Sequence, residues 1–250
     1  MSRQQVLERG RYTARFAKSQ ADLLAAQRLR YLSFRAEAPD ADGLDADAFD
    51  PACAHVLVED TASGQLVCCF RLLHLKDGSE IRRSYSAQFY ELSALCDFSG
   101  PMVEMGRFCI HPAWHDPDIL RLAWGAMTAY VDRERVEMLF GCSSFQGTDA
   151  ETYADAFALL QERHIAPKRW LPRVKAPRVI DFAKRLTRRP DLKLAQTRMP
   201  PLLRTYLLMG GWVSDHAVVD SDLDTLHVFT GLEISAVPPA RARLLRAVAG

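Results

Sequence analysis

The apolar residues of this 250-residue chain follow two spacings in turn, and their order constrains the fold more than any other feature. Runs with strand character are bounded by turn residues and alternate with segments in which apolar residues recur at helical spacing. We expect strands at residues 11–17, 55–59, 65–74, 103–110, 138–143, 212–219 and 226–234. We expect helices at residues 21–37, 84–95, 117–136, 150–163, 202–209 and 241–249. This order predicts an α/β chain built around one mixed sheet.

Composition narrows the class of protein. With 48% apolar and 25% charged residues, the chain can bury a core and is not a disordered segment. No apolar run approaches the roughly 18 residues of a membrane span, and residues 1–12 lack the apolar stretch of a secretory signal. The six cysteines form no Cys-x-x-Cys pair, which predicts reduced thiols, no metal site and a cytoplasmic location. We expect a single domain over residues 1–250, with a basic, proline-containing region at residues 164–201.

The formal net charge is only +1, but the charges are segregated along the chain. Residues 37–60 carry eight acids and no Lys or Arg, whereas residues 163–204 carry thirteen Lys and Arg and two acids. Such a division can attract a cation at one place and a polyanion at another. We do not expect nucleic acid as the polyanion, because the chain has no nucleic-acid motif and few aromatic residues among the basic ones.

Asp45, Asp47 and Asp50 stand close together within the acidic stretch. In a turn, their carboxylates can converge on one cation, either a metal ion or an ammonium group. A calcium loop of the EF-hand kind is excluded, because the glycine and the terminal glutamate that it needs are missing. The alternative is an ordinary solvated acidic loop.

Charged residues also interrupt the apolar strands. Glu104 is either a candidate general base in a cleft or half of a structural ion pair, because a buried glutamate is costly unless it is paired. Side-chain alternation places Glu104 and Gly106 on one face of their strand and Arg107 on the other. Arg71 lies in the strand expected at residues 65–74, and Arg30 lies on the first helix; each is expected to pair with a carboxylate.

The order of these residues resembles the acyl-homoserine-lactone synthase branch of the GNAT-like acyltransferases. That branch has an Arg–Phe helix, an acid-x-Asp-x-x-Asp loop, an arginine in a hairpin and a Glu-x-x-Arg-Phe strand. The matching residues are Arg30 and Phe34, then Asp45, Asp47 and Asp50, then Arg71, then Glu104, Arg107 and Phe108. The resemblance implies a GNAT-like fold, in which helices flank a central, mixed and mostly antiparallel sheet.

The rest of the chain is similar to the bacterial ornithine N-acyltransferase family, which makes lyso-ornithine lipid, and to a relative that acylates glutamine. The similarity lies in residues 107–112, 201–206, 210–216 and 225–229. It implies transfer of a 3-hydroxyacyl chain from acyl carrier protein to the α-amine of a free amino acid, with no bound cofactor. The acidic stretch favours ornithine as the acceptor, and glutamine or the lactone synthase reaction are the alternatives.

The resemblance also implies roles for the matching residues. Glu104 is expected to take the proton of the attacking amine, and the aspartates are expected to hold the side-chain ammonium of ornithine. Arg71 or Arg107 would bind the substrate carboxylate or brace the acids. Arg30 and Phe34 complete the expected substrate site. The acyl-donor site, with a backbone N–H for the oxyanion, is expected at Phe108, Cys109 and Ile110.

The expected acyl donor follows from a difference between this chain and the GNAT enzymes that use coenzyme A. Where GNAT enzymes that use coenzyme A carry a glycine-containing pyrophosphate loop, residues 121–126 lack the required glycine spacing. This departure fits acyl carrier protein, which has no pyrophosphate to be held. An acidic carrier protein, or anionic lipid at the inner membrane face, suits the basic region, and a solvated basic face is the alternative. The expected docking residues are Lys168, Arg169, Arg173, Lys175, Arg178, Lys184, Arg185, Arg188 and Arg189.

Three further patterns compete with this interpretation. His111 and Asp116 have the His-x4-Asp spacing of glycerolipid O-acyltransferases, and Cys109 is a possible nucleophile beside the site. Residues 214–216 read Ser-Asp-His, but neighbours in sequence do not make a catalytic triad. We expect none of the three to carry the chemistry.

Overall fold

The structure is a computed structural model that describes residues 6–35, 43–185 and 189–249. The chain divides into two compact units, each described here by itself. Unit 1 comprises Met1–His74, Met105–Val136 and Pro239–Gly250, and unit 2 comprises Leu75–Glu104 and Glu137–Pro238. The single domain expected over residues 1–250 stays a prediction. Within the described ranges, no helix has both the length and the apolar character needed to cross a membrane.

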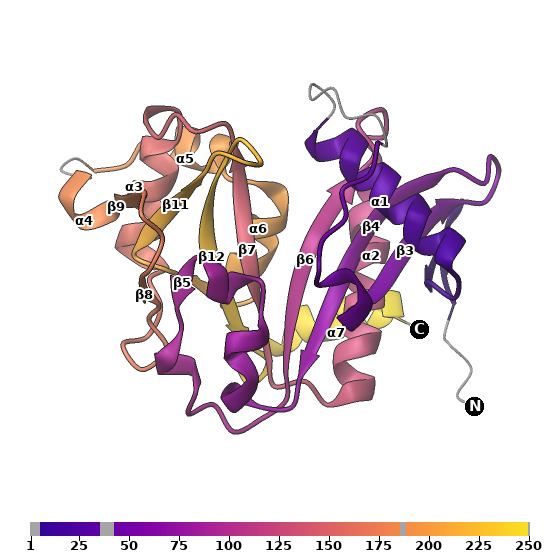
Figure 1. Cartoon of the computed structure of the whole chain (residues 1–250), viewed down its shortest axis with the longest axis horizontal. Helices are drawn as coiled ribbons and strands as arrows, with labels where there is room; N and C mark the ends of the chain where they lie inside the picture. The colour runs from indigo at the N-terminus through magenta and orange to yellow at the C-terminus, as the bar shows by residue number, and fades with distance from the viewer. Residues whose placement is uncertain (1–5, 36–42, 186–188, 250) are drawn as a thin grey trace. The chain divides into compact units, whose positions relative to one another are not determined.

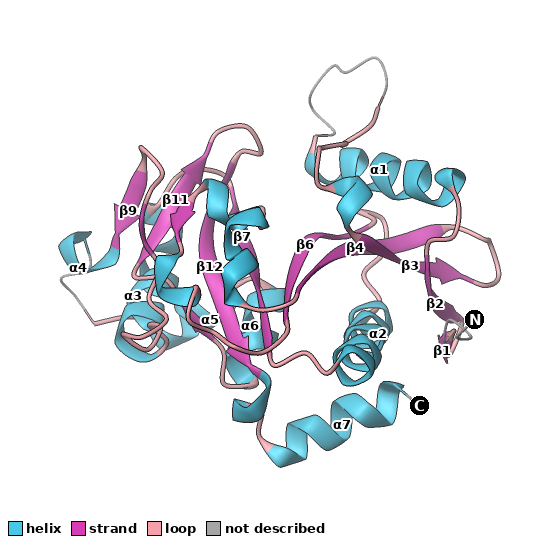
Figure 2. Ribbon diagram, turned by 60° about the horizontal axis from the view of Figure 1, so that its bottom comes forward, coloured by secondary structure: helices cyan, strands magenta, loops and turns pink. Residues whose placement is uncertain are grey.

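Unit 1 is a sheet with helices on both faces (Figure 1 and Figure 2). Its antiparallel strands are β1 (Leu7–Arg9), β2 (Tyr12–Phe16), β3 (Ala54–Asp60) and β4 (Leu66–Leu75), and the second part of β6 (Met102–Ile110) follows β4. Helix α1 (Gln20–Phe34) lies over β3, while α2 (Pro117–Glu134) packs against β1 to β3 from the other face. Helix α7 (Pro239–Ala249) packs on α2.

Local sequence explains these elements. In β2, Tyr12, Ala14 and Phe16 are buried and the residues between them are more exposed, as the alternation predicts. Helix α1 begins after Ser19, whose side chain accepts a hydrogen bond from the Asp22 N–H. The β3–β4 hairpin turns at Gly64, which has a positive φ of 69°.

Unit 2 is built on a second run of strands. The first part of β6 pairs in parallel with β7 (Met138–Gln146), and the other pairings are antiparallel. They follow the order β7, β12 (Thr225–Glu233), β11 (His216–Asp220) and β9 (Val179–Asp181), with β10 (Trp212–Val213) also on β12. An apolar cluster fills one face of these strands; it includes Phe145, Phe157 and Leu160. The helices of this unit are α3 (Ala154–Arg163), α4 (Phe182–Arg185), α5 (Leu192–Arg198) and α6 (Pro201–Leu208).

The helix predicted at residues 84–95 is wrong. The structure has two short 3-10 turns there, η3 (Ser86–Gln88) and η4 (Ser93–Leu95), with the short strand β5 (Tyr90–Glu91) between them. The N–H groups of Tyr85 and Ser86 donate to the Glu104 carboxylate, and β5 pairs with β8 (Arg173–Val174). Contacts with partners distant in sequence, Glu104 and β8, therefore hold this stretch in a conformation that is not a regular helix.

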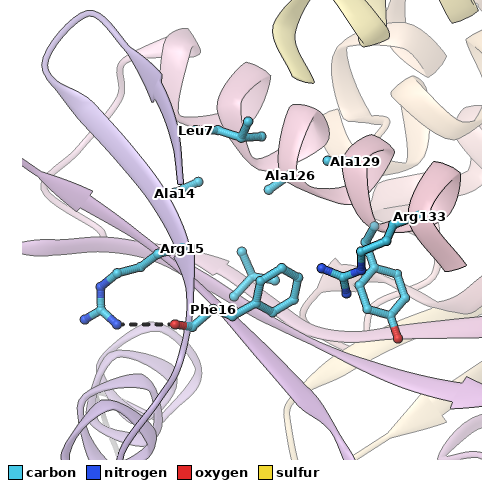
Figure 3. Close-up of a pocket in the computed structure, with 9 residues that line it drawn as sticks. Leu7, Ala14, Arg15, Phe16, Ala126, Ala129 and Arg133 are labelled. Atoms are coloured by element: carbon cyan, nitrogen blue, oxygen red, sulfur yellow. Dashed lines mark hydrogen bonds between the residues drawn. The ribbon is translucent and has the colours of Figure 1, made fainter. Parts of the chain in front are cut away.

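A small pocket opens between β2 and α2 (Figure 3). Apolar side chains, among them Leu7, Ala14 and Ala126, line most of it. Arg133 lies over the rings of Phe16 and Tyr130, at 5.2 and 5.1 Å from their centroids. The lining contains no carboxylate and none of the residues predicted for the site.

Close contact between α2 and α7 generates a stability prediction. A Cβ atom added at Gly125 would lie 2.7 Å from Val248 Cγ1 and 3.2 Å from its carbonyl oxygen. We expect Gly125→Val to lower the free energy of unfolding by about 2 kcal/mol, because overpacking forces the helices apart. Urea unfolding measures this change. Ala247→Val, at an exposed position of α7, should cost less than about 0.7 kcal/mol, and equal effects of the two variants would contradict the prediction.

Candidate active site

Three aspartates and three arginines of unit 1 form one hydrogen-bonded group. This acid–arginine cluster consists of Arg30, Asp45, Asp47, Asp50, Arg71 and Arg107. Helix α1 supplies Arg30, the loop that runs into η1 (Asp50–Ala52) supplies the aspartates, and β4 and β6 supply Arg71 and Arg107. The structure thus brings together six of the residues predicted for the site. Glu37, Asp40 and Asp42, from the same acidic stretch, lie outside the described residues.

The arginines cross-link the aspartates. Arg30 donates from Nε to Asp45 at 2.8 Å and from Nη1 to Asp50 at 2.7 Å. Arg71 donates from Nη1 to Asp50 at 2.6 Å and from Nη2 to Asp47 at 2.8 Å. Arg107 lies 3.0 Å from Asp45 through Nε and 3.2 Å from Asp47 through Nη2. Each carboxylate therefore meets two of the three guanidinium groups, and bracing of the acids is the role that this geometry favours for Arg71 and Arg107.

Burial makes the pairing necessary. The side chains of Arg30, Arg71 and Asp50 are only 1, 3 and 3% exposed, and unpaired charges at such positions would be very costly. Asp47 is the most exposed of the three aspartates, at 21%. Burial disfavours the ionised form of Asp50, but hydrogen bonds from Arg30 and Gln27 outweigh this effect and lower the pKa of Asp50 to about 2.

Neighbours that the sequence analysis missed complete the cluster. Gln27 donates to Asp50 at 2.8 Å, and the His55 ring lies 3.0 Å from the Asp50 carbonyl oxygen through Nε2. The guanidinium of Arg71 lies 5.6 Å from the centroid of the Phe49 ring. Gln27 could have been found, because it is a polar residue one helical turn before Arg30 on the buried face of α1.

The backbone of β6 bends at Arg107, which has a φ of 53°. This left-handed conformation is uncommon for a residue other than glycine and interrupts the side-chain alternation of a strand. A Cβ atom on Gly106 would lie 3.6 Å from Arg71 Nε, while Arg107 reaches Asp45 and Asp47. The prediction that Gly106 and Arg107 face opposite ways is therefore wrong, because both consecutive positions are directed at the cluster.

Other predicted residues of unit 1 take part in packing. Phe34 packs against an apolar cluster that contains Cys109 and Cys69, whose sulfur atoms lie 3.5 Å apart. Phe108 stacks on Phe70, with ring centroids 5.6 Å apart, and the Ile110 carbonyl accepts from Ser33. Cys109 is only 5% exposed and has the surroundings of a core residue.

Glu104 belongs to unit 2, where its side chain is 4% exposed. Its carboxylate accepts hydrogen bonds from the N–H groups of Tyr85 and Ser86, both at 2.7 Å, and from Ser86 Oγ at 2.5 Å. Ser86 Oγ also lies 3.4 Å from Cys142 Sγ. Donors of this kind stabilise an ionised carboxylate in an otherwise dry environment. Ser86 was missed because it lies 18 residues from Glu104 and has no sequence signal.

The predicted docking residues that the structure describes lie on two segments of unit 2. Lys168, Arg169, Arg173, Lys175 and Arg178 are exposed on residues 168–178, here called the basic strap. The strap adjoins residues 85–89, the turn whose first two N–H groups donate to Glu104. Lys175 Nζ donates to the Ala87 carbonyl oxygen, and the Ala176 N–H donates to the Phe89 carbonyl oxygen. Lys184 and Arg189 lie exposed on and after α4, whereas the Arg185 side chain and Arg188 lie outside the description.

The competing patterns are held in structural roles. Asp116 caps α2 and accepts from Tyr12 Oη at 3.0 Å, and His111 Nδ1 accepts from the Ala113 N–H. Ser214 Oγ donates to the carbonyl of His216 and not to its ring. Among the residues that the structure describes, no group of three or more His, Cys, Asp or Glu side chains is placed to hold a metal ion.

Comparison with known proteins identifies the class to which this fold belongs. The acetyltransferase (GNAT) domain family matches residues 29–125. FeeM, an N-acyl amino acid synthase from uncultured soil microbes, is similar in structure with a TM-score of 0.52 and 12% identity, over 92% of this chain and 98% of that one. With the mixed, mostly antiparallel sheet flanked by helices, these matches confirm the predicted GNAT-like fold. The protein therefore has the fold of the GNAT acyltransferases.

Sequence relatives define the family more narrowly. An L-ornithine N(alpha)-acyltransferase of Rhodobacter capsulatus is 31% identical over 90% of this chain and 91% of its own length. One from Brucella abortus is 32% identical over 91% of this chain and 86% of its own length. The chain belongs to the L-ornithine N(alpha)-acyltransferase family, as the sequence resemblance predicted.

The cluster predicts unequal costs for two matched substitutions. Asp50→Asn removes a buried charge that Arg30 and Arg71 share, and we expect the free energy of unfolding to fall by about 3 kcal/mol. Asp47→Asn removes the most exposed carboxylate and should cost about 1 kcal/mol or less. Urea unfolding at neutral pH measures both. Equal costs would show that burial does not set the strength of these pairs.

The lowered pKa of Asp50 also determines how the stability of the folded state changes with pH. Asp50 stabilises the folded state while it is ionised, so its contribution is complete above the ordinary pKa of an aspartate and is lost as pH falls towards 2. The stability difference between the native chain and Asp50→Asn should therefore shrink between about pH 4 and pH 2.

Proposed function

We propose that the chain transfers a 3-hydroxyacyl group from the thioester of acyl carrier protein to the α-amine of ornithine, and so makes lyso-ornithine lipid. The observation that carries this proposal is the 31% identity to the Rhodobacter capsulatus L-ornithine N(alpha)-acyltransferase, over 238 residues. Near-complete coverage of both chains means that the similarity is not confined to the acetyltransferase domain. Glutamine, the alternative acceptor, lacks the second amine of ornithine.

The start of α2 supports a donor without pyrophosphate. A helix N-terminus can bind an anion through its free N–H groups. Here the Asp116 side chain already accepts from the Asp118 N–H, while the Asp118 carboxylate is paired with Arg9 and Arg121. The Asp116 carboxylate therefore occupies the place at which a pyrophosphate would bind, and would repel it. Acyl carrier protein presents its pantetheine on a single phosphate and needs no such site.

The basic strap is the part of the basic region that suits the carrier protein. It carries five exposed cations, and an acidic partner would be steered towards them. The strap is also hydrogen-bonded to the turn that binds Glu104, through Lys175 to Ala87 at 2.5 Å and Ala176 to Phe89 at 3.0 Å. A carrier protein docked there would deliver its thioester to the unit that contains the proposed base.

In the proposed reaction, the α-ammonium of ornithine first releases one proton to solvent, because only a neutral amine is nucleophilic, and Glu104 takes a second proton from the nitrogen as it attacks. The amine nitrogen forms a bond to the thioester carbonyl carbon, and the bond from carbon to sulfur breaks. The proton passes to the leaving thiolate, which departs as the thiol of the carrier protein. A backbone N–H near Phe108, Cys109 and Ile110 is the proposed donor to the oxyanion.

The acid–arginine cluster is proposed to shape the acceptor site. Its three aspartates meet Arg30, Arg71 and Arg107, and Asp45 also meets Arg35 at 3.4 Å, so the cluster has no surplus negative charge. Asp47, the most exposed of the acids, is the residue we propose to meet the side-chain ammonium of ornithine. Arg30, Arg71 and Arg107 then fix Asp47 and its neighbours, with Phe34 packed beneath. We also propose a cytoplasmic location, with peripheral contact at the inner membrane face.

A product assay tests the function. Purified protein is incubated with 3-hydroxyacyl carrier protein and equal amounts of ornithine, glutamine and S-adenosylmethionine, and products are identified by mass spectrometry. We expect acyl-ornithine to dominate. Acyl-glutamine as the main product would overturn the acceptor, a homoserine lactone would move the chain to the lactone synthases, and no product would refute the donor.

A pair of substitutions tests Glu104 as the base. Glu104→Gln should lower kcat by about a hundredfold or more, while Glu104→Asp keeps part of the activity. Ser86→Ala removes one donor to the carboxylate, which favours its protonation. We therefore expect the acid limb of the kcat profile to move to higher pH in Ser86→Ala. Ser93→Ala, a control on the same segment, should leave the limb in place, and an unmoved limb in Ser86→Ala would count against Glu104.

A further inference from the structure

Helix α5 of unit 2 exposes two leucines at its beginning. Leu192 is 44% exposed and Leu194 is 43% exposed, although both are large apolar side chains. Residues 189–194, here called the α5 tip, also carry the exposed cations Arg189 and Lys193. Leu192, Lys193 and Leu194 place two exposed apolar side chains directly beside a cation.

The rest of α5 holds this tip in place. Ala195 is fully buried and Met199 is 3% exposed, and both belong to the apolar cluster of unit 2. The Asp191 N–H donates to the buried Asp155 of α3 at 2.9 Å. The leucines are therefore presented by an anchored helix, so the exposed position is a property of the fold.

The charge of the tip indicates the kind of partner. Residues 189–204 contain four Lys and Arg and a single acid, Asp191. The Asp191 carboxylate is turned back to cap α5, where it accepts from the N–H groups of Lys193 and Leu194 at 2.9 and 3.0 Å. Apolar side chains flanked by cations match an anionic bilayer, in which leucines enter the acyl boundary and cations meet the headgroups.

We propose that the α5 tip is a membrane-docking surface, at which Leu192 and Leu194 enter an anionic bilayer and Arg189 and Lys193 contact its headgroups. The inference rests on the proposed function, because an acylated amino acid is amphipathic and must pass from the enzyme into a bilayer. The proposal assigns the two parts of the basic region to different partners: the strap receives the carrier protein, and the α5 tip contacts lipid.

Vesicle binding tests the proposal without any acyl transfer. The full chain is sedimented with vesicles of phosphatidylcholine, with and without added phosphatidylglycerol. We expect binding only to the anionic vesicles, and weaker binding as salt is raised. The double variant Leu192→Ser, Leu194→Ser should lower the partition coefficient about tenfold. Leu208→Ser, at an exposed leucine that ends α6, should leave it unchanged.

A second measurement, the KM for acyl carrier protein, separates lipid binding from binding of the carrier protein. In vesicle-free solution, the leucine double variant should keep the native KM for acyl carrier protein, whereas Arg173→Glu in the strap should raise that KM and leave vesicle binding largely intact. If the leucine variant instead loses affinity for the carrier protein, the tip is a protein-docking surface and the proposal is wrong. Equal vesicle binding by native and leucine variant chains also overturns it.

A further variant tests whether another exposed leucine makes the lipid contact instead. Leu244 on α7 is 63% exposed beside Arg241 and Arg243. If Leu244→Ser abolishes vesicle binding and the α5 variant does not, the lipid surface is on α7 and the proposal falls. Absence of acyl-ornithine in the product assay would refute the proposed function without changing the vesicle result, so the two failures are distinguishable.

Discussion

Three arginines neutralise three aspartates inside unit 1, and the position of four chain segments depends on this pairing. Helix α1, the acidic loop, β4 and β6 each contribute at least one charge to the cluster. If one segment moved, a buried charge would lose its partner, which is far more costly than the loss of a surface ion pair. In the described part of the acidic loop, residues 43–50, the buried residues are Asp45 and Asp50. Ionic contacts, and not an apolar core, therefore hold this loop in place.

Strand β6 carries both Glu104, which belongs to unit 2, and Arg107, which belongs to unit 1. Glu104 lies in its first part, where β6 pairs in parallel with β7, and Arg107 lies three residues further on at the left-handed bend. A regular strand would direct Gly106 and Arg107 to opposite faces. The bend instead gives the acid–arginine cluster both a guanidinium and, at Gly106, room for the Arg71 side chain. A local backbone cost is thus offset by buried ion pairs.

Sequence alone predicted most elements, because periodicity reports which face of each element is buried. It also predicted which acids and arginines belong together, through the order in which they recur in related enzymes. It failed at residues 84–95, where a helix was predicted but the N–H groups of Tyr85 and Ser86 donate to Glu104 and β5 pairs with β8. It treated the basic region as one surface, because linear charge density does not show that the strap pairs with β5 while α5 packs on α3. Both failures concern contacts between segments distant in sequence.

The beginning of α2 limits which substitutions the fold tolerates at Asp116. A helix start can satisfy one anion, and in this chain the protein's own Asp116 occupies that place and also accepts from Tyr12. Replacing Asp116 to admit a ligand phosphate would forfeit both a helix cap and a bond that ties α2 to β2. On the proposal that this helix start would otherwise receive a donor phosphate, no single substitution at Asp116 could admit one without loosening the sheet of unit 1. Stability and choice of donor would then depend on the same side chain, and a change of donor would require compensating substitutions elsewhere in the fold.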